Sequence, residues 1–86
     1  MDLRLRNEQL DWKQIDDEIV VLDERRAEYV SIEGAGVALW CALEEGSTRE
    51  SLIGALVARY AVGSEQAAAD VDAFITDLAA RELLTA

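Results

Sequence analysis

The sequence predicts an α+β fold in which a three-stranded antiparallel meander is followed by three helices, in the order βββααα. In the first third of the chain, short runs of β-branched and aromatic residues alternate with polar turns, which is typical of strands. The remainder carries apolar residues at helical spacing, interrupted by glycines. With 86 residues, the chain has room for a single domain, 1–86, of winged-helix-like topology.

Three short strands are expected ahead of the helices. Trp12 and Ile15 anchor the first strand, Asp11–Ile15, and the β-branched run Glu18–Leu22 forms the second. Ala27–Ile32 forms the third. Because the connecting turns are only two and four residues long, the strands must pair antiparallel, since parallel pairing needs long crossovers.

The two ends of the chain give weaker signals. Met1–Leu10 has no clear period and is predicted to be a loose arm or a frayed lead-in to a strand. Leu83 and Leu84 form a short apolar tail that is expected to fold back on the core.

The first two helices are predicted from their end signals. The first covers Ala35–Glu44 and stops at Gly46, the glycine expected after a helix end. Ser47 and Glu50 match the capping box S-x-x-E and are expected to open the second helix. The second helix carries one apolar stripe along its length: Leu52, Ile53, Leu56, Val57 and Tyr60.

The third helix, with Ser64 as its expected cap, has the most regular pattern in the chain. Its apolar residues recur at i, i+3, i+4, i+7 and i+8, which predicts one buried stripe. Asp70 and Asp77 are seven residues apart and therefore flank that stripe on the same side. The stripe comprises Val71, Phe74, Ile75, Leu78 and Ala79.

The charge balance limits the classes of partner. Eighteen acidic and eight basic side chains give a net charge of −10, which repels phosphate backbones and attracts basic segments. Acidity that serves only solubility is the alternative. A helix-turn-helix role on DNA is the alternative for the last two helices, but they offer only Arg49, Arg59 and Arg81 for phosphate contacts. No nucleic-acid partner is therefore predicted.

Catalytic and metal-binding motifs are missing from the sequence. There is no histidine, so the commonest general base and metal ligand is absent, and no enzyme activity, metal or cofactor is predicted. Asp16–Glu18 is interpreted as a solvated turn and not as a metal cluster. Cys41 is expected to be a buried, inert thiol. No apolar run has membrane-spanning length, so a cytoplasmic protein without a membrane partner is predicted.

The third strand is expected to be an edge of the sheet. Glu28 is its only charged residue between Ala27 and Ile32, so it is poorly protected against pairing with another strand. Such an edge is suited to accept a peptide by strand addition, although a loop that covers it is the alternative. Glu28, Val30 and Ile32 share one face and Tyr29 and Ser31 the other, and the sequence leaves open which face is buried.

Several short motifs, in the right order, resemble one protein family. Tyr29-Val30-Ser31-Ile32, then Gly36, then Leu39-Trp40 is similar to the family pattern Y-x-x-L…G-x-x-[IL]-W. Asp70–Ile75 is similar to its D-V-x-x-F-[LI], and a terminal Leu83-Leu84 follows. Across Lys13–Leu84, the chain resembles the PqqD-like proteins, also called RiPP recognition elements. It departs from the pattern at Glu33, where Asn is common, and at Glu82, where Gly is usual.

The resemblance implies a non-catalytic module that binds the leader segment of a ribosomally made precursor peptide and presents it to modifying enzymes. A free-standing acidic chain of this size looks most like the lasso-peptide version, which implies a partner leader peptidase and a cyclase. The sibling possibility is a peptide chaperone for a radical enzyme in quinone-cofactor synthesis. Given the acidic surface, the leader is expected to carry basic residues.

The resemblance also implies where the leader binds: it adds to the third strand and lies against the third helix. The residues themselves point to the same groove, with core packing as the alternative for its apolar members. The candidate peptide-binding residues are Glu28, Tyr29, Val30, Ser31, Ile32, Asp70, Val71, Phe74, Ile75, Asp77 and Leu78.

Overall fold

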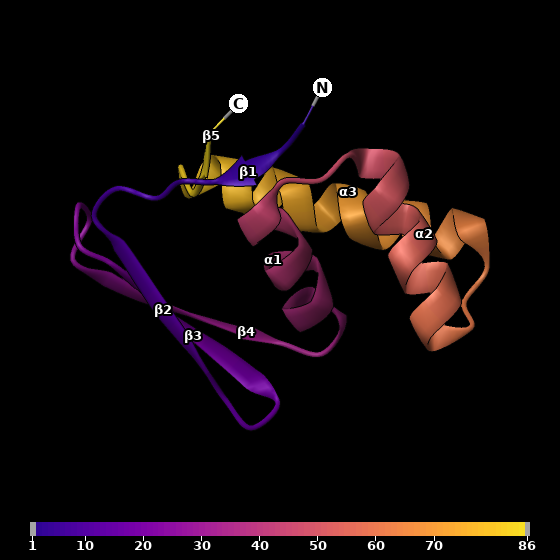
Figure 1. The fold of residues 1–86 in the computed structure, drawn as a ribbon, viewed down its shortest axis with the longest axis horizontal. Coiled ribbons are helices and arrows are strands. Elements are labelled where there is room, and N and C mark those ends of the chain that lie inside the picture. Colours follow the sequence, from indigo (N-terminus) through magenta and orange to yellow (C-terminus); the bar gives the residue numbers. More distant parts are fainter. Residues whose placement is uncertain (1, 86) are drawn as a thin grey trace.

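The computed structural model describes residues 2–85 and confirms the α+β architecture. Strands β2 (Leu10–Ile15), β3 (Glu18–Asp23) and β4 (Glu28–Glu33) form an antiparallel sheet in that order. The helices gather on one side of this sheet, as Figure 1 shows. They are α1 (Ala35–Glu45), α2 (Arg49–Tyr60) and α3 (Ser64–Ala80).

The N-terminal segment is more ordered than the sequence predicted. Arg4–Leu5 forms a short strand, β1, that pairs antiparallel with β5, Leu84–Thr85, so the expectation of a loose arm over Met1–Leu10 is wrong for these residues. Leu3 and Ser47 form a further isolated bridge. A two-residue strand has no periodicity to detect, and its partner lies at the other end of the sequence. The C-terminal tail does fold back, as predicted, and Leu83 is fully buried.

Two helix caps differ from the prediction. Thr48, and not Ser47, caps α2, and its hydroxyl accepts a hydrogen bond from the Ser51 backbone N–H over 3.1 Å. The Ser47 backbone is already bonded to Leu3, which keeps Ser47 outside the helix. Gly63 occupies the N-cap of α3, so Ser64 is its first helical residue. Gly46 ends α1 with φ 94°, as expected for a C-terminal glycine.

The core lies between the inner face of the sheet and the helices. Ile19 and Val21 of β3 are fully buried, together with Leu39, Trp40 and Leu43 on one face of α1. Trp12 of β2 packs edge-on against Trp40, with ring centroids 6.0 Å apart. Further buried side chains come from each remaining helix and from the C-terminal tail: Leu52, Leu56, Ala67, Val71, Leu78 and Leu83. Cys41 is half-buried, whereas the sequence prediction had it buried.

A buried ion pair ties the chain ends to the β3–β4 loop. Arg6 Nη2 lies 2.6 Å from Asp23 Oδ1, and the two side chains are 6% and 2% exposed. Arg6 also donates to the backbone carbonyls of Glu8, Gln9 and Glu82. Burial raises the pKa of Asp23, but the hydrogen bonds from Arg6 and from loop backbone amides lower it further, so the net shift is downward. The start of β4 is thereby fixed against the N-terminal segment.

No helix within residues 2–85 combines the length and the hydrophobicity needed to cross a membrane.

Candidate peptide-binding groove

The two faces of β4 have different surroundings, which settles the question that the sequence left open. Ile32 is buried and Val30 half-buried, so their face is turned toward the helices. Tyr29 and Ser31 are exposed on the opposite face, and the Tyr29 side chain is 75% exposed. Glu28, which shares the parity of Val30 and Ile32, lies at the solvated start of the strand beside Arg26.

The backbone of β4 presents free hydrogen-bonding groups at the sheet edge. The Glu24 N–H donates to the Gln9 carbonyl, which shows that even-numbered residues of β3 direct their backbone groups toward β2. The odd-numbered residues therefore face β4, where they pair with Glu28, Val30 and Ile32. The N–H and C=O groups of Tyr29, Ser31 and Glu33 point away from β3. No described strand pairs with this edge.

A groove of about 260 Å³ runs between the inner side of this edge and α3. Six of the candidate residues line it: Val30, Ser31, Ile32, Phe74, Asp77 and Leu78. Along α3 and its C-cap, the lining residues Phe74, Asp77, Leu78 and Arg81 follow at i, i+3, i+4 and i+7, so one face of that helix borders the groove. The free backbone groups of the edge and the side chains that line the groove thus lie along the same four strand residues, Val30–Glu33.

The structure does not bring the other five candidate residues into this groove. Val71 is fully buried in the core, and Ile75 lines a separate hollow near Arg6 and Leu84. Asp70 is exposed and accepts a hydrogen bond from Gln66. The last two, Glu28 and Tyr29, lie at the start of β4. The backbone groups of Tyr29 point to the open edge, and its side chain lies exposed on the outer face of the sheet.

Three residues that line the groove were missed as candidates from the sequence: Glu33, Gly36 and Arg81. Arg81 follows Asp77 by four residues and could have been found from helical spacing, and its Nε lies 3.2 Å from Asp77 Oδ2. Gly36 carries no side chain to suggest a binding role, although it stood in the family pattern found in the sequence. Asp77 and Arg81 neutralise each other in part, and Glu33 is the third charged residue of the lining.

The polar groups near the site offer no reactive pair. Within residues 2–85, no three His, Cys, Asp or Glu side chains lie close enough to hold a metal. Arg49 of α2 is bonded to Asp72 of α3 at 2.6 and 2.9 Å, and this bond lowers the pKa of Asp72. Arg49 and Arg81, two of the three arginines that could contact DNA phosphates, are therefore already in ion pairs with carboxylates. What the groove offers chemically is hydrogen bonds and apolar contact.

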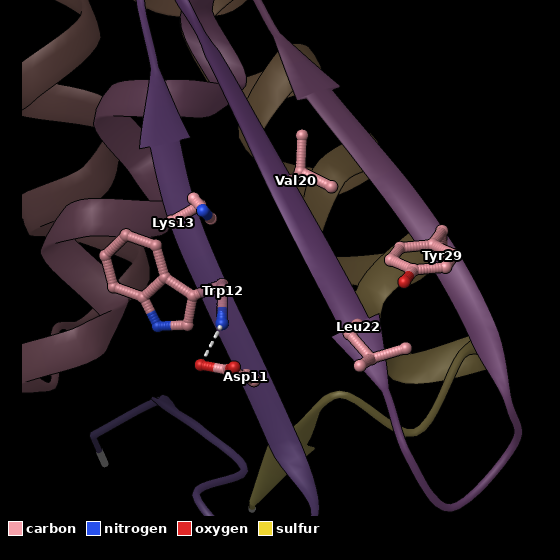
Figure 2. A pocket seen from close by; sticks show the side chains of 6 residues that line it. All are labelled: Asp11, Trp12, Lys13, Val20, Leu22 and Tyr29. Carbon is pink, nitrogen blue, oxygen red and sulfur yellow. Dashed lines mark hydrogen bonds between the residues drawn. The ribbon is translucent and has the colours of Figure 1, made fainter.

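The outer face of the sheet carries a smaller hollow, of about 200 Å³. Figure 2 shows Val20 and Leu22 of β3 and Tyr29 of β4 on this face. The hydroxyl of Ser31 donates to the Glu18 carboxylate on the same side. This hollow also touches Asp11–Lys13 of β2. It crosses the sheet and meets β4 only at Tyr29, so it does not follow the free edge of β4.

Comparisons with known proteins agree with the sequence motifs. Residues 18–84 match the family model described as coenzyme PQQ synthesis protein D, PqqD. The structure described as TbiB1 in complex with the TbiA(beta) leader peptide is similar at 31% identity, with a TM-score of 0.86 over 94% of this chain and 93% of that one. A lasso peptide synthetase B1 complexed with the leader peptide shares the fold, at 24% identity and a TM-score of 0.87 over 100% of both chains.

No curated protein matched the sequence. The family model spans most of the chain, from the start of β3 to β5, and so includes β4, α3 and the groove between them. The resemblance found in the motifs is confirmed, and this chain belongs to the PqqD family, the PqqD-like RiPP recognition elements.

Proposed function

We propose that this chain binds the leader segment of a ribosomally synthesised precursor peptide in lasso-peptide biosynthesis. The leader adds as a strand to the β4 edge, and its inward side chains enter the groove beside α3. One observation carries the proposal: the free backbone groups of Tyr29, Ser31 and Glu33 lie along the same stretch of chain as the groove lining. The leader-bound TbiB1, at 31% identity, supports it.

Strand addition explains how one small surface gives both affinity and selectivity. Backbone hydrogen bonds form with any extended peptide, whereas the groove accepts only side chains that fit between β4 and α3. Val30, Phe74 and Leu78 give its wall apolar contact area, and Asp77, Arg81 and Glu33 contribute charged groups to the same lining. A leader with apolar residues at alternate positions, flanked by basic ones, fits this lining.

The chain itself does not catalyse a reaction in this proposal. It delivers the bound leader to a separate leader peptidase, and a cyclase then closes the ring, all in the cytoplasm. Holding the substrate near the peptidase raises its effective concentration there. The purified chain is expected neither to cleave nor to modify a precursor peptide, but to accelerate cleavage by the peptidase. Cleavage by the chain alone, detected by mass spectrometry, would refute this part of the proposal.

A peptide chaperone for a radical enzyme in quinone-cofactor synthesis is the second candidate, and the description of the matching family model favours it. Both candidates use the same groove and differ in the peptide. Titration of the chain against the TbiA(beta) leader and against a quinone-cofactor precursor separates them. Tighter binding of the cofactor precursor would favour the second candidate.

Residue-resolved hydrogen exchange tests the binding mode. With saturating leader, the amides of Tyr29, Ser31 and Glu33 should gain protection, because their N–H groups then bond to the added strand. The amides of Glu28, Val30 and Ile32 already pair with β3 and should change less. The leader should become extended and not helical. New protection confined to the edge of β2 or to α2 would show that β4 is not the docking edge.

A further inference from the structure

Gly36 lies where β4, α1 and α3 meet, and it lines the groove. It is the second residue of α1, and its φ lies outside the left-handed region, so the backbone does not require glycine there. Alanine is the better helix former. What glycine provides at this position is space.

The space beside Gly36 is occupied by two side chains. A Cβ built on Gly36 lies 3.0 Å from Ile32 Cγ2 and 3.1 Å from Phe74 Cε1. Carbon atoms in favourable contact are about 3.5–4.0 Å apart, so an alanine would press on both neighbours, and each contact must lengthen by a few tenths of an ångström.

The surroundings of the two neighbours decide which side chain moves further. Ile32 is buried, and its strand residue is paired with Ile19 in the sheet. Phe74 is only half-buried, and its ring borders the groove. The ring meets less resistance, and the groove is the open space next to it.

We propose that Gly36 is a specificity-determining position for the bound peptide, acting through Phe74. The absent side chain lets the ring lie back against α1, which keeps the groove deep enough for a bulky apolar side chain that points inward from the added strand. A Cβ at this position makes the groove shallower without touching its hydrogen-bonding edge. This inference rests on the proposed leader binding.

The test compares Gly36→Ala with Gly54→Ala. Gly54 lies within α2, and a Cβ there meets no atom within 4 Å, so it is a matched control for the glycine-to-alanine change. The probe is the TbiA(beta) leader peptide, or a leader that binds more tightly in the titration above. Gly36→Ala should weaken binding about tenfold, or about 1.4 kcal/mol, because the displaced ring takes up space that the leader side chain needs. Gly54→Ala should leave the affinity unchanged and raise the Tm by about 4 °C.

The Phe74→Leu background tests whether Gly36 acts through the ring of Phe74 or only through the stability of the fold. Leucine lacks the ring atom that the new Cβ meets, so Gly36→Ala should cost much less affinity in the Phe74→Leu background than in the parent. If Gly36→Ala alone fails to fold, the double variant should restore folding. An equal loss in both backgrounds, or no restoration, would overturn the proposal, because the ring would not be the intermediary.

A measurement without peptide keeps this proposal separate from leader binding itself. Gly36→Ala should shift the NMR resonances of the Phe74 ring and change its contacts to Ile32 in the free protein, and Gly54→Ala should not. If the parent chain binds no leader, the proposed function fails, whatever the ring does. If the parent binds and the ring and the affinity are both unchanged in Gly36→Ala, the assignment of Gly36 fails alone.

Discussion

The sheet has two edges, β2 and β4, and each has unpaired backbone groups and a hollow nearby. Beside β4, the hollow is lined by four consecutive strand residues, Val30–Glu33. Two hollows touch β2. One, of about 590 Å³, reaches that strand only at Gln14 and otherwise lies against the β2–β3 turn, Gly34, α1 and α2. The other, of about 200 Å³, touches Asp11–Lys13 but then crosses β3 to Tyr29 and does not follow the β2 edge. An open edge alone is therefore a poor docking site, because a strand needs backbone partners and a side-chain wall over the same length.

Among the variants that compare the two edges, Phe74→Ala should have the largest effect on leader binding. Loss of a half-buried ring is expected to cost about 2–3 kcal/mol of stability, less than for a fully buried phenylalanine, and more than about 1 kcal/mol of leader binding. Trp12→Ala at the β2 edge is the control, since Trp12 also packs on the core. It should lower the Tm and leave leader affinity unchanged. Thermal melts beside titrations measure both, and equal losses of affinity in the two variants would contradict the comparison.

Asp23→Asn should destabilise the β4 side of the sheet by weakening the buried pair with Arg6. The pKa of Asp23 is lower in the folded chain than its ordinary value of 3.8, so its carboxylate contributes stability at neutral pH that is lost as the pH falls through the folded pKa. The variant should have a lower Tm at pH 7 and a smaller fall in Tm between pH 5 and acid, a window that follows from that shift.

Asp16→Asn is the matched change in the β2–β3 turn, where Asp16 adopts φ 54°. Asparagine tolerates that conformation, so this variant should melt close to the parent. Equal Tm losses in the two turns would show that the Arg6–Asp23 pair does not fix β4 in particular.

Ser31→Pro should weaken leader binding by about 1 kcal/mol or more. Ser31 directs its N–H to the open edge, so proline removes a donor to the leader without breaking a bond to β3. Gln14→Pro on β2 is the control, because the pairing places its N–H at the other edge. Calorimetric titration of both variants measures the difference. If Gln14→Pro weakens binding and Ser31→Pro does not, the leader uses the β2 edge.

Much of the fold could be predicted because local signals agreed with the final packing. The strand runs, the two short turns and the glycine after α1 each fixed an element within one or two residues. The β1–β5 pair was missed, since its stability comes from contacts between the chain ends. The cap of α2 was placed one residue early because Ser47 and Thr48 are both good caps, and the Leu3–Ser47 bridge decides between them.

The site was predictable at the level of elements and less so for single residues. Strand parity placed Val30 and Ile32 together, but burial was needed to show which face they occupy. The regular stripe on α3 mixed two roles, since Val71 supports the core while Phe74 and Leu78 border the groove. Periodicity identifies the apolar face of a helix. It does not show which residues along that face are buried in the core and which border an open groove.

The smallest expected effect concerns charge, and it separates two carboxylates on α3. Asp77 lines the groove, whereas Asp70 is exposed outside it, so only Asp77→Lys should slow association with a basic leader beyond the general effect of net charge. Asp77 already forms an ion pair with Arg81, with Arg81 Nε 3.2 Å from Asp77 Oδ2. Because this pair reduces the charge that the leader meets, the association rate at low salt should change only by about a few-fold. Asp70→Lys carries the same charge change and is the matched control. Stopped-flow measurements over a salt series should show the difference between the variants shrinking as salt rises. Equal slowing by both variants would mean that the leader senses only the overall charge of −10 and not the groove.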